Sequence, residues 1–172
     1  KELRELPPAP TFLADAAPRG SSLAGTDAAL AWPLPTLALA PPGPTTAIGA
    51  AVPVVPLAWV REVLAAPPCH ALPQAPRGVA GLVAWRGQSL LVRDLREPGA
   101  GAPTGADRLL IVGPPDGDAL GALLAPGVHG LLTLAAPAPP PATPWRRDLP
   151  VAASARQGGR AVAVLDVAAL FA

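Results

Sequence analysis

The chain has 172 residues and a formal net charge of +1, which argues against a nucleic-acid-binding protein, since such proteins normally carry a basic face. Hydrophobic residues make up 51% of it but aromatic residues only 3%, so a core has to be built from closely packed Ala, Leu and Val. With 26 Pro and 17 Gly, the chain approaches the roughly 25–30% at which disorder is expected, so part of it is predicted to be tail or linker.

Residues 1–35 are predicted to form a Pro/Ala-rich flexible N-terminal tail, followed by a folded domain over residues 36–172. Clustered prolines near the start block regular structure. Two interpretations of this segment stay open. It is either a flexible tail or a docking peptide anchored by Phe12, Leu13 and Trp32.

Short strands and tight turns are predicted from there on, beginning with Leu37–Ala40 and Ala47–Val55. Pro53 cannot donate a ladder hydrogen bond, so it predicts an edge strand or a bulge. Pro56 suits the first turn of a helix, and the apolar residues of Leu57–Leu64 recur at helical spacing. The sequence therefore predicts a short helix at Leu57–Leu64.

A β-hairpin is the clearest local prediction. The apolar runs Val79–Trp85 and Gln88–Leu95 flank Arg86-Gly87, and a glycine at the second turn position supplies the positive φ that a tight turn requires.

The remaining chain continues this pattern, with Val128–Leu134 expected to extend a meander and with a short terminal helix after the N-cap candidate Asp166. The further strands are predicted at Arg108–Val112, Ala119–Leu124, Val128–Leu134, Val151–Arg156 and Ala161–Leu165.

Two stretches of the chain have similar sequences. Gly87–Leu95 aligns with Gly159–Val167, each a glycine turn, an apolar strand and an Asp. Chance alignment of small aliphatics is one explanation. The other is a pair of related β-subdomains, each a small curled barrel.

Catalytic and metal-binding groups are not apparent. The two histidines are His70 and His129, and the adjacent Cys69 and His70 are poorly placed for a dyad. Asp116 and the nearby Asp118 suit a turn better than a cation loop. We therefore expect no enzyme, no metal site and no cofactor.

A protein-binding surface is the remaining candidate site. Arg77, Arg86, Arg93 and Arg96 lie within 20 residues of one another, and Glu62 supplies an acid. Trp and Arg are common interface anchors, which draws attention to Trp85-Arg86. Core burial is the better expectation for Trp85, whereas interface and solvated interpretations of Arg86 stay open.

Two features of the sequence suit a cytoplasmic protein. The single Cys69 excludes an internal disulfide and favours a reducing cytoplasm. No uninterrupted apolar run of about 20 residues is present, so neither a transmembrane helix nor direct membrane insertion is expected.

Several motifs follow one another along the chain, with an order and spacing that run from about Leu37 to Phe171. They are Pro53-Val-Val-Pro-Leu-Ala-Trp-Val-Arg-Glu-Val63, Leu72-Pro-Gln-Ala-Pro76, Gly78-Val-Ala-Gly-Leu-Val-Ala-Trp-Arg-Gly87, Leu91-Val-Arg-Asp-Leu95 and the closing Gly159-Arg-Ala-Val-Ala-Val-Leu-Asp-Val167. Together these motifs resemble the CheW family of chemotaxis coupling proteins.

The resemblance implies a mainly β fold of two intertwined, SH3-like, five-stranded β-barrel subdomains with short helices. It implies a non-catalytic adaptor that couples the regulatory domain of a CheA-like histidine kinase to chemoreceptor cytoplasmic tips, at membrane-associated arrays. By position, Arg86 and Gly87 match the family hairpin near those contacts, and Val60 and Glu62 match the helix after the second strand. Trp85, Arg77 and Arg93 complete the predicted binding site.

A second hypothesis rests on departures from the family pattern, of which the strongest is in the hairpin. Ala84 stands where the family hairpin carries Asn. The alternative function is therefore a divergent CheW-like scaffold or array-integration module of a pilus-type system, which binds other partners.

Overall fold

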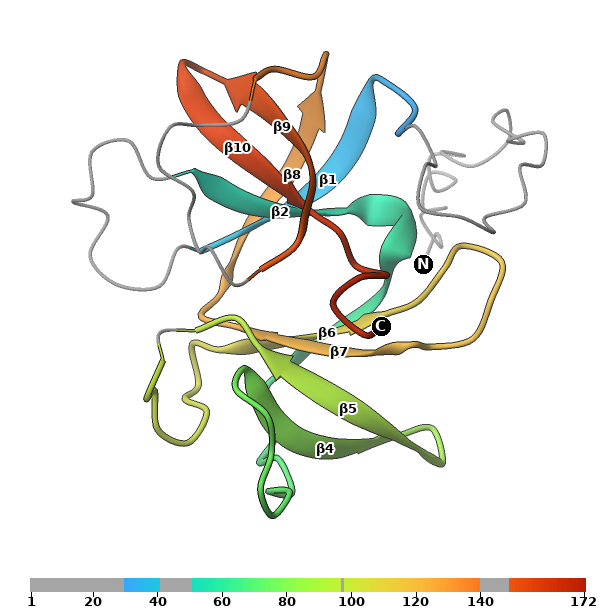
Figure 1. Ribbon diagram of the computed structural model, residues 1–172, viewed down its shortest axis with the longest axis vertical. Coiled ribbons are helices and arrows are strands. Elements are labelled where there is room, and N and C mark those ends of the chain that lie inside the picture. Colours follow the sequence, from blue (N-terminus) through green and yellow to red (C-terminus); the bar gives the residue numbers. More distant parts are fainter. Residues whose placement is uncertain (1–29, 41–50, 97, 140–148) are drawn as a thin grey trace, which may run out of the picture. The chain divides into compact units, whose positions relative to one another are not determined.

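The structure is a computed structural model that describes residues 30–40, 51–96, 98–139 and 149–172 (Figure 1). The chain divides into two units, Lys1–Leu30 and Ala31–Ala172, and all elements below belong to the second. The predicted tail lies mostly outside the described residues and stays a prediction. Its last two positions already belong to the first strand.

The described residues are almost entirely β-strands in two five-stranded sheets. Sheet A comprises β1 (Leu34–Leu39), β2 (Val52–Pro56), β8 (Val128–Leu134), β9 (Val151–Gln157) and β10 (Arg160–Leu165). Sheet B comprises β3 (Val60–Ala65), β4 (Val79–Trp85), β5 (Gln88–Asp94), β6 (Arg108–Val112) and β7 (Gly121–Ala125).

The two sheets have the same internal arrangement. Sheet A has the order β8-β1-β2-β10-β9 and sheet B the order β3-β6-β7-β5-β4. In each order the first, second and fourth pairings are antiparallel and the third is parallel. The two similar segments, Gly87–Leu95 and Gly159–Val167, form β5 and β10, and each of these strands is the fourth in its sheet order. This confirms the prediction of two β-subdomains.

Strands β6 and β7, which lie inside sheet B, are buried on both faces, which explains why they are almost continuously apolar. Leu109 and Ile111 belong to a core on one face, with Val92 and Leu124. Their neighbours Leu110 and Val112 belong to a second core, which also takes in Leu37 and Val55 of sheet A. The second core holds the two sheets together.

The β4–β5 hairpin has the predicted strands, shown in green in Figure 1. Its turn has φ of 47° at Arg86 and 80° at Gly87. Positive φ at both central positions is the type I′ arrangement, whose twist matches that of the strands. Only the glycine adopts it without steric cost.

The helix predicted at Leu57–Leu64 is wrong. A single 3-10 turn covers Leu57–Trp59, and Val60–Ala65 is strand β3, antiparallel to β6. Along β3 the burial alternates, leaving Val63 42% exposed. Apolar residues three and four apart also fit a strand when one of them faces solvent, and pairing with β6 decides the outcome.

The prediction of a short terminal helix is also wrong, although Asp166 does cap the segment that follows it. Asp166 accepts a bond from the Ala169 N–H at 3.0 Å, and its carbonyl accepts one from the Leu170 N–H at 3.1 Å. A single turn forms, and Leu170 and Phe171 pack on the second core.

Two topological expectations need correction. β2 lies inside sheet A, so Pro53 is not on an edge strand. Its missing donor is tolerated because the β1 register covers only Val54–Pro56, and Pro53 is in register with Ala163 alone. In addition, β8 does not continue the meander of β6 and β7, because it pairs with β1 in the other sheet.

Candidate functional site

Three of the predicted site residues meet where the two edge strands of sheet B come together. Glu62 lies on β3 and Trp85 on β4, which are the two edge strands of this sheet. The Trp85 indole N–H donates to the Glu62 carboxylate at 2.9 Å, and Arg86 donates to the same oxygen at 3.2 Å. The three residues form one cluster, referred to below as the hairpin cluster.

Trp85 connects this surface to the core. It is half-buried and packs against the core on the inner face of sheet B. The expectation of core burial is thus partly met, because the ring is packed while its N–H reaches a carboxylate at the rim. A buried indole N–H normally needs such an acceptor.

Arg86 is the exposed member of the cluster. Its side chain is 71% exposed, against 33% for Glu62, and its guanidinium carbon lies 4.7 Å from the centre of the Trp85 ring. An ion pair this exposed contributes about 0–1 kcal/mol to stability. The guanidinium is held by the carboxylate and the ring, yet most of its surface faces solvent.

Apart from Gly87, the other predicted residues lie outside the cluster. Val60 is half-buried against the second core, and Arg77 is exposed in the turn before β4. Arg93 is half-buried on β5, and its Nε is buried with no hydrogen-bond partner among the described residues. Gly87 belongs to the site through the turn, with open space around its Cα.

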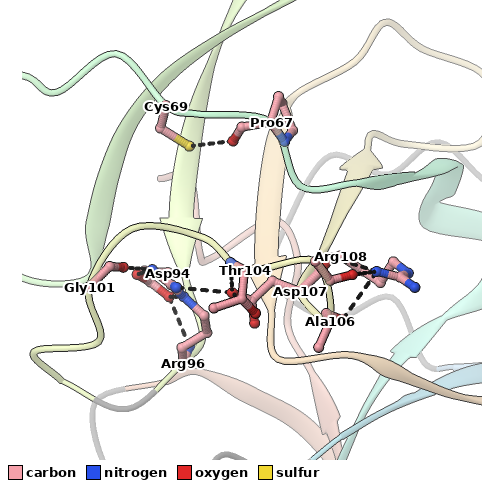
Figure 2. Close-up of polar contacts among 10 residues, drawn as sticks. Pro67, Cys69, Asp94, Arg96, Gly101, Thr104, Ala106, Asp107 and Arg108 are labelled. Carbon is pink, nitrogen blue, oxygen red and sulfur yellow. Dashed lines mark hydrogen bonds and ion pairs between the residues drawn. The ribbon is translucent and has the colours of Figure 1, made fainter.

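Sequence reasoning placed Arg96 in the surface cluster, but the structure buries it. Arg96 is 7% exposed and bonds the Asp94 carboxylate at 2.8 Å and the Asp107 carboxylate at 3.2 Å (Figure 2). It also donates to the Gly101 carbonyl, while Asp107 accepts bonds from Thr104. This network fastens the loop between β5 and β6.

The Asp94 hydrogen bond is the largest cause that raises the Arg96 pKa, so the network holds a full charge. The sequence indicated this ion pair only by placing an Asp at the end of a strand, two residues before an Arg. That pattern does not indicate that the pair is buried.

Arg61, next to Glu62, makes a contact that the sequence did not indicate. Its guanidinium donates to the carbonyls of Pro114 and Gly117 in the β6–β7 turn. Asp116 and Asp118 are exposed in that turn. Over the described ranges, no three His, Cys, Asp or Glu residues come together as a metal site.

Within the described residues, no helix is long and apolar enough to cross a bilayer.

Comparisons with known proteins identify a family and a fold. Residues 45–172 match the family model described as CheW, CheW-like domain. Among solved structures, the chain is similar to the scaffolding protein TtCheW from Thermoanaerobacter tengcongensis, with 19% identity and a TM-score of 0.64, over 81% of this chain and 92% of that one. No curated protein gives a significant match. At this identity the structural likeness concerns the fold, including two sheets of SH3-like type.

Proposed function

Because this chain belongs to the CheW-like domain family, we propose that it couples a CheA-type histidine kinase to the cytoplasmic tips of chemoreceptors. As a member of that family it is a non-catalytic scaffolding domain, with protein partners in chemosensory arrays. The regulatory domain of the kinase and the receptor tip are the proposed partners, and the cytoplasmic side of the array is the proposed location.

The hairpin cluster supports this proposal and is its proposed binding site. Arginine anchors gain affinity when they are presented in a fixed orientation, because less side-chain freedom is then lost on binding. Arg86 meets this condition, since a type I′ turn sets its backbone and Glu62 and Trp85 hold its guanidinium. A partner carboxylate or carbonyl could bond the exposed side of that group.

The test is direct binding of the full chain to the kinase regulatory domain and to a receptor tip from the same organism. Arg86→Glu should weaken binding to at least one of them by roughly tenfold or more, as for a true anchor. Arg156→Glu is the control, because Arg156 is equally an exposed arginine beside a hairpin turn, in sheet A. Unchanged binding of both partners by Arg86→Glu would show that the site is wrongly assigned.

A second candidate function rests on Ala84. It is exposed on β4, opposite Ser89 in the same hairpin. A methyl group at this position offers no hydrogen bond to a partner, which favours an array-integration module with different partners. If the unmodified chain binds neither kinase nor receptor, the coupling proposal fails and this function is preferred.

A further inference from the structure

We propose that the inner face of sheet A binds a small aromatic carboxylate, in a hollow that corresponds to the place of the Trp85 ring in sheet B. The residues that line this hollow include Ala38, Gly130, Leu132, Gln157, Arg160 and Val162. The site depends neither on Arg86 nor on the proposed coupling function, since the hairpin cluster belongs to sheet B.

The inner face of sheet A is the face turned away from the second core. Leu37 belongs to that core, and Ala38 follows it in β1, so Ala38 points to the inner face. Register places Gly130 of β8 beside Ala38 on this face. The exposed Leu131 is in register with Leu37, so its side chain lies on the other face and takes no part in the site.

Strand pairing makes the two sheets equivalent residue by residue. Across the two hairpins, Trp85 is in register with Gln88 as Gln157 is with Arg160. Across the other strands, the successive register partners are Glu62, Ile111, Ala122 and Val92 in sheet B, and Gly130, Ala38, Val54 and Val164 in sheet A. Gln157 therefore corresponds to Trp85, and Gly130 corresponds to Glu62.

Smaller residues at the equivalent positions leave the hollow in sheet A. In sheet B, the Trp85 indole bonds Glu62 and packs against a core that includes Ile111. The residues of sheet A at these three positions are all smaller, namely Gln157, Gly130 and Ala38. All three line the hollow, whose volume is about 240 Å³. The place that a tryptophan side chain fills in one sheet is thus open in the other.

The size and lining of the hollow favour a flat aromatic ligand. Ligand sites often lie in the mouths of β-barrels and measure roughly 300–1,000 Å³ for drug-sized molecules, so about 240 Å³ suits one or two fused rings. Leu132 and Val162 form apolar walls. Their equivalents in sheet B, Leu64 and Leu90, belong to the group of residues against which the Trp85 ring packs.

Charge at the rim favours a carboxylate on that ligand. The five strands of sheet A contain no Asp or Glu, and Arg160 and His129 both line the hollow. Arg160 makes no ion pair within the described part of the chain. Its equivalent in sheet B is the neutral Gln88, so the cation is particular to sheet A. A ligand carboxylate would form a charge-assisted hydrogen bond with Arg160, whereas an amine would be repelled.

Arg156 supplies a matched control within the same hairpin. Arg160 is in register with Gln157, and Arg156 with Ala161, so the two arginines point to opposite faces of the hairpin. Arg156 does not line the hollow and bonds the Gly159 carbonyl instead.

The experiment is an NMR titration of the isotope-labelled full chain with indoleacetate, a bicyclic ring that carries a carboxylate. Binding should saturate with a Kd of about 1 mM or lower, the range for a ligand of this size. Tryptamine has the same ring with an ammonium group and should bind at least roughly tenfold more weakly. The shifts should concentrate at Ala38, Gly130, Leu132, Gln157 and Val162.

Three variants test the residues of the site. Gln157→Trp gives sheet A the side chain that sheet B has at this position, and it should abolish binding because the new ring fills the hollow. Arg160→Glu should weaken binding by roughly tenfold, the scale of reversing a charge at a rim. Arg156→Glu should leave binding within about twofold, and raising the salt concentration should weaken binding to the unmodified chain.

Several outcomes would overturn the proposal. They are no saturation at millimolar indoleacetate, shifts elsewhere on the chain, equal binding of tryptamine, or equal losses in Arg156→Glu and Arg160→Glu. Unchanged binding in Gln157→Trp would equally exclude this hollow as the site. Circular dichroism verifies that each variant is folded, and the arginine pair decides the question if Gln157→Trp does not fold. Kinase or receptor binding has no bearing on this test, so the two proposals fail separately.

Discussion

The indole N–H of Trp85 donates to the Glu62 carboxylate at 2.9 Å and thereby joins the two edge strands of sheet B. The residues are 23 positions apart in the chain, and their strands are separated by three others in the sheet. Closing a sheet on itself removes unpaired edges from solvent. The same bond orients the carboxylate that holds Arg86, so fold closure and the proposed binding site depend on one contact.

Removing the acceptor of this bond should destabilise the protein. Glu62→Leu leaves the indole N–H without its carboxylate, and we expect the free energy of unfolding to fall by about 1–3 kcal/mol. Glu62→Gln keeps an oxygen acceptor and should cost less than about 1 kcal/mol. Urea unfolding followed by circular dichroism measures both. Equal losses in the two variants would contradict a closing role for the bond.

Replacing Arg86 should separate stability from binding. A non-glycine residue with φ of 47° carries strain of roughly 1–2 kcal/mol, which Asn tolerates better. The exposed ion pair that Arg86→Asn removes is worth at most about 1 kcal/mol. Stability should therefore stay the same or rise, while partner binding falls. A drop of more than about 1 kcal/mol in urea unfolding would show that the guanidinium has a structural role.

The buried network around Arg96 should dominate the stability of the β5–β6 loop. Arg96→Leu removes the cation that both Asp94 and Asp107 bond, and deleting one member of a buried ion pair costs about 3–5 kcal/mol. Arg77→Leu, at an exposed turn, is the control and should change stability by less than about 0.5 kcal/mol. A loss below about 1 kcal/mol for Arg96→Leu would mean that the network is dispensable.

Cys69 should react slowly in the native protein. Burial raises the pKa of its thiol, and the Asp94 carboxylate adds to the shift. The reactive thiolate is therefore scarcer at pH 8 than in the unfolded chain, and iodoacetamide should label the native protein several-fold more slowly than the urea-unfolded protein. Mass spectrometry measures both rates, and equal rates would contradict this prediction.

The same shift has a consequence for stability. A thiol whose folded pKa is raised binds its proton more tightly in the native state. The related stability is fully present below the unfolded pKa of about 8.5 and is lost as pH rises above it. Cys69→Ser should remove this alkaline loss.

Local chemistry in the sequence was sufficient for several elements. Alternating apolar residues around Arg86-Gly87 predicted the strands of the β4–β5 hairpin, because a two-residue turn fixes its register from nearby atoms alone. The repeated pattern of Gly87–Leu95 and Gly159–Val167 predicted two related subdomains, and the motif order predicted the family. These features depend on neighbours a few residues away.

Tertiary structure decided the rest, because the deciding partners are distant in sequence. Local spacing predicts a helix where β3 lies, and pairing with β6 makes this segment a strand. Glu62 meets Trp85 only when sheet B closes, and Arg96 is buried only when the Asp107 loop folds over it. Sequence predicted which residues form strands and turns, while closure of the two sheets decided which side chains meet.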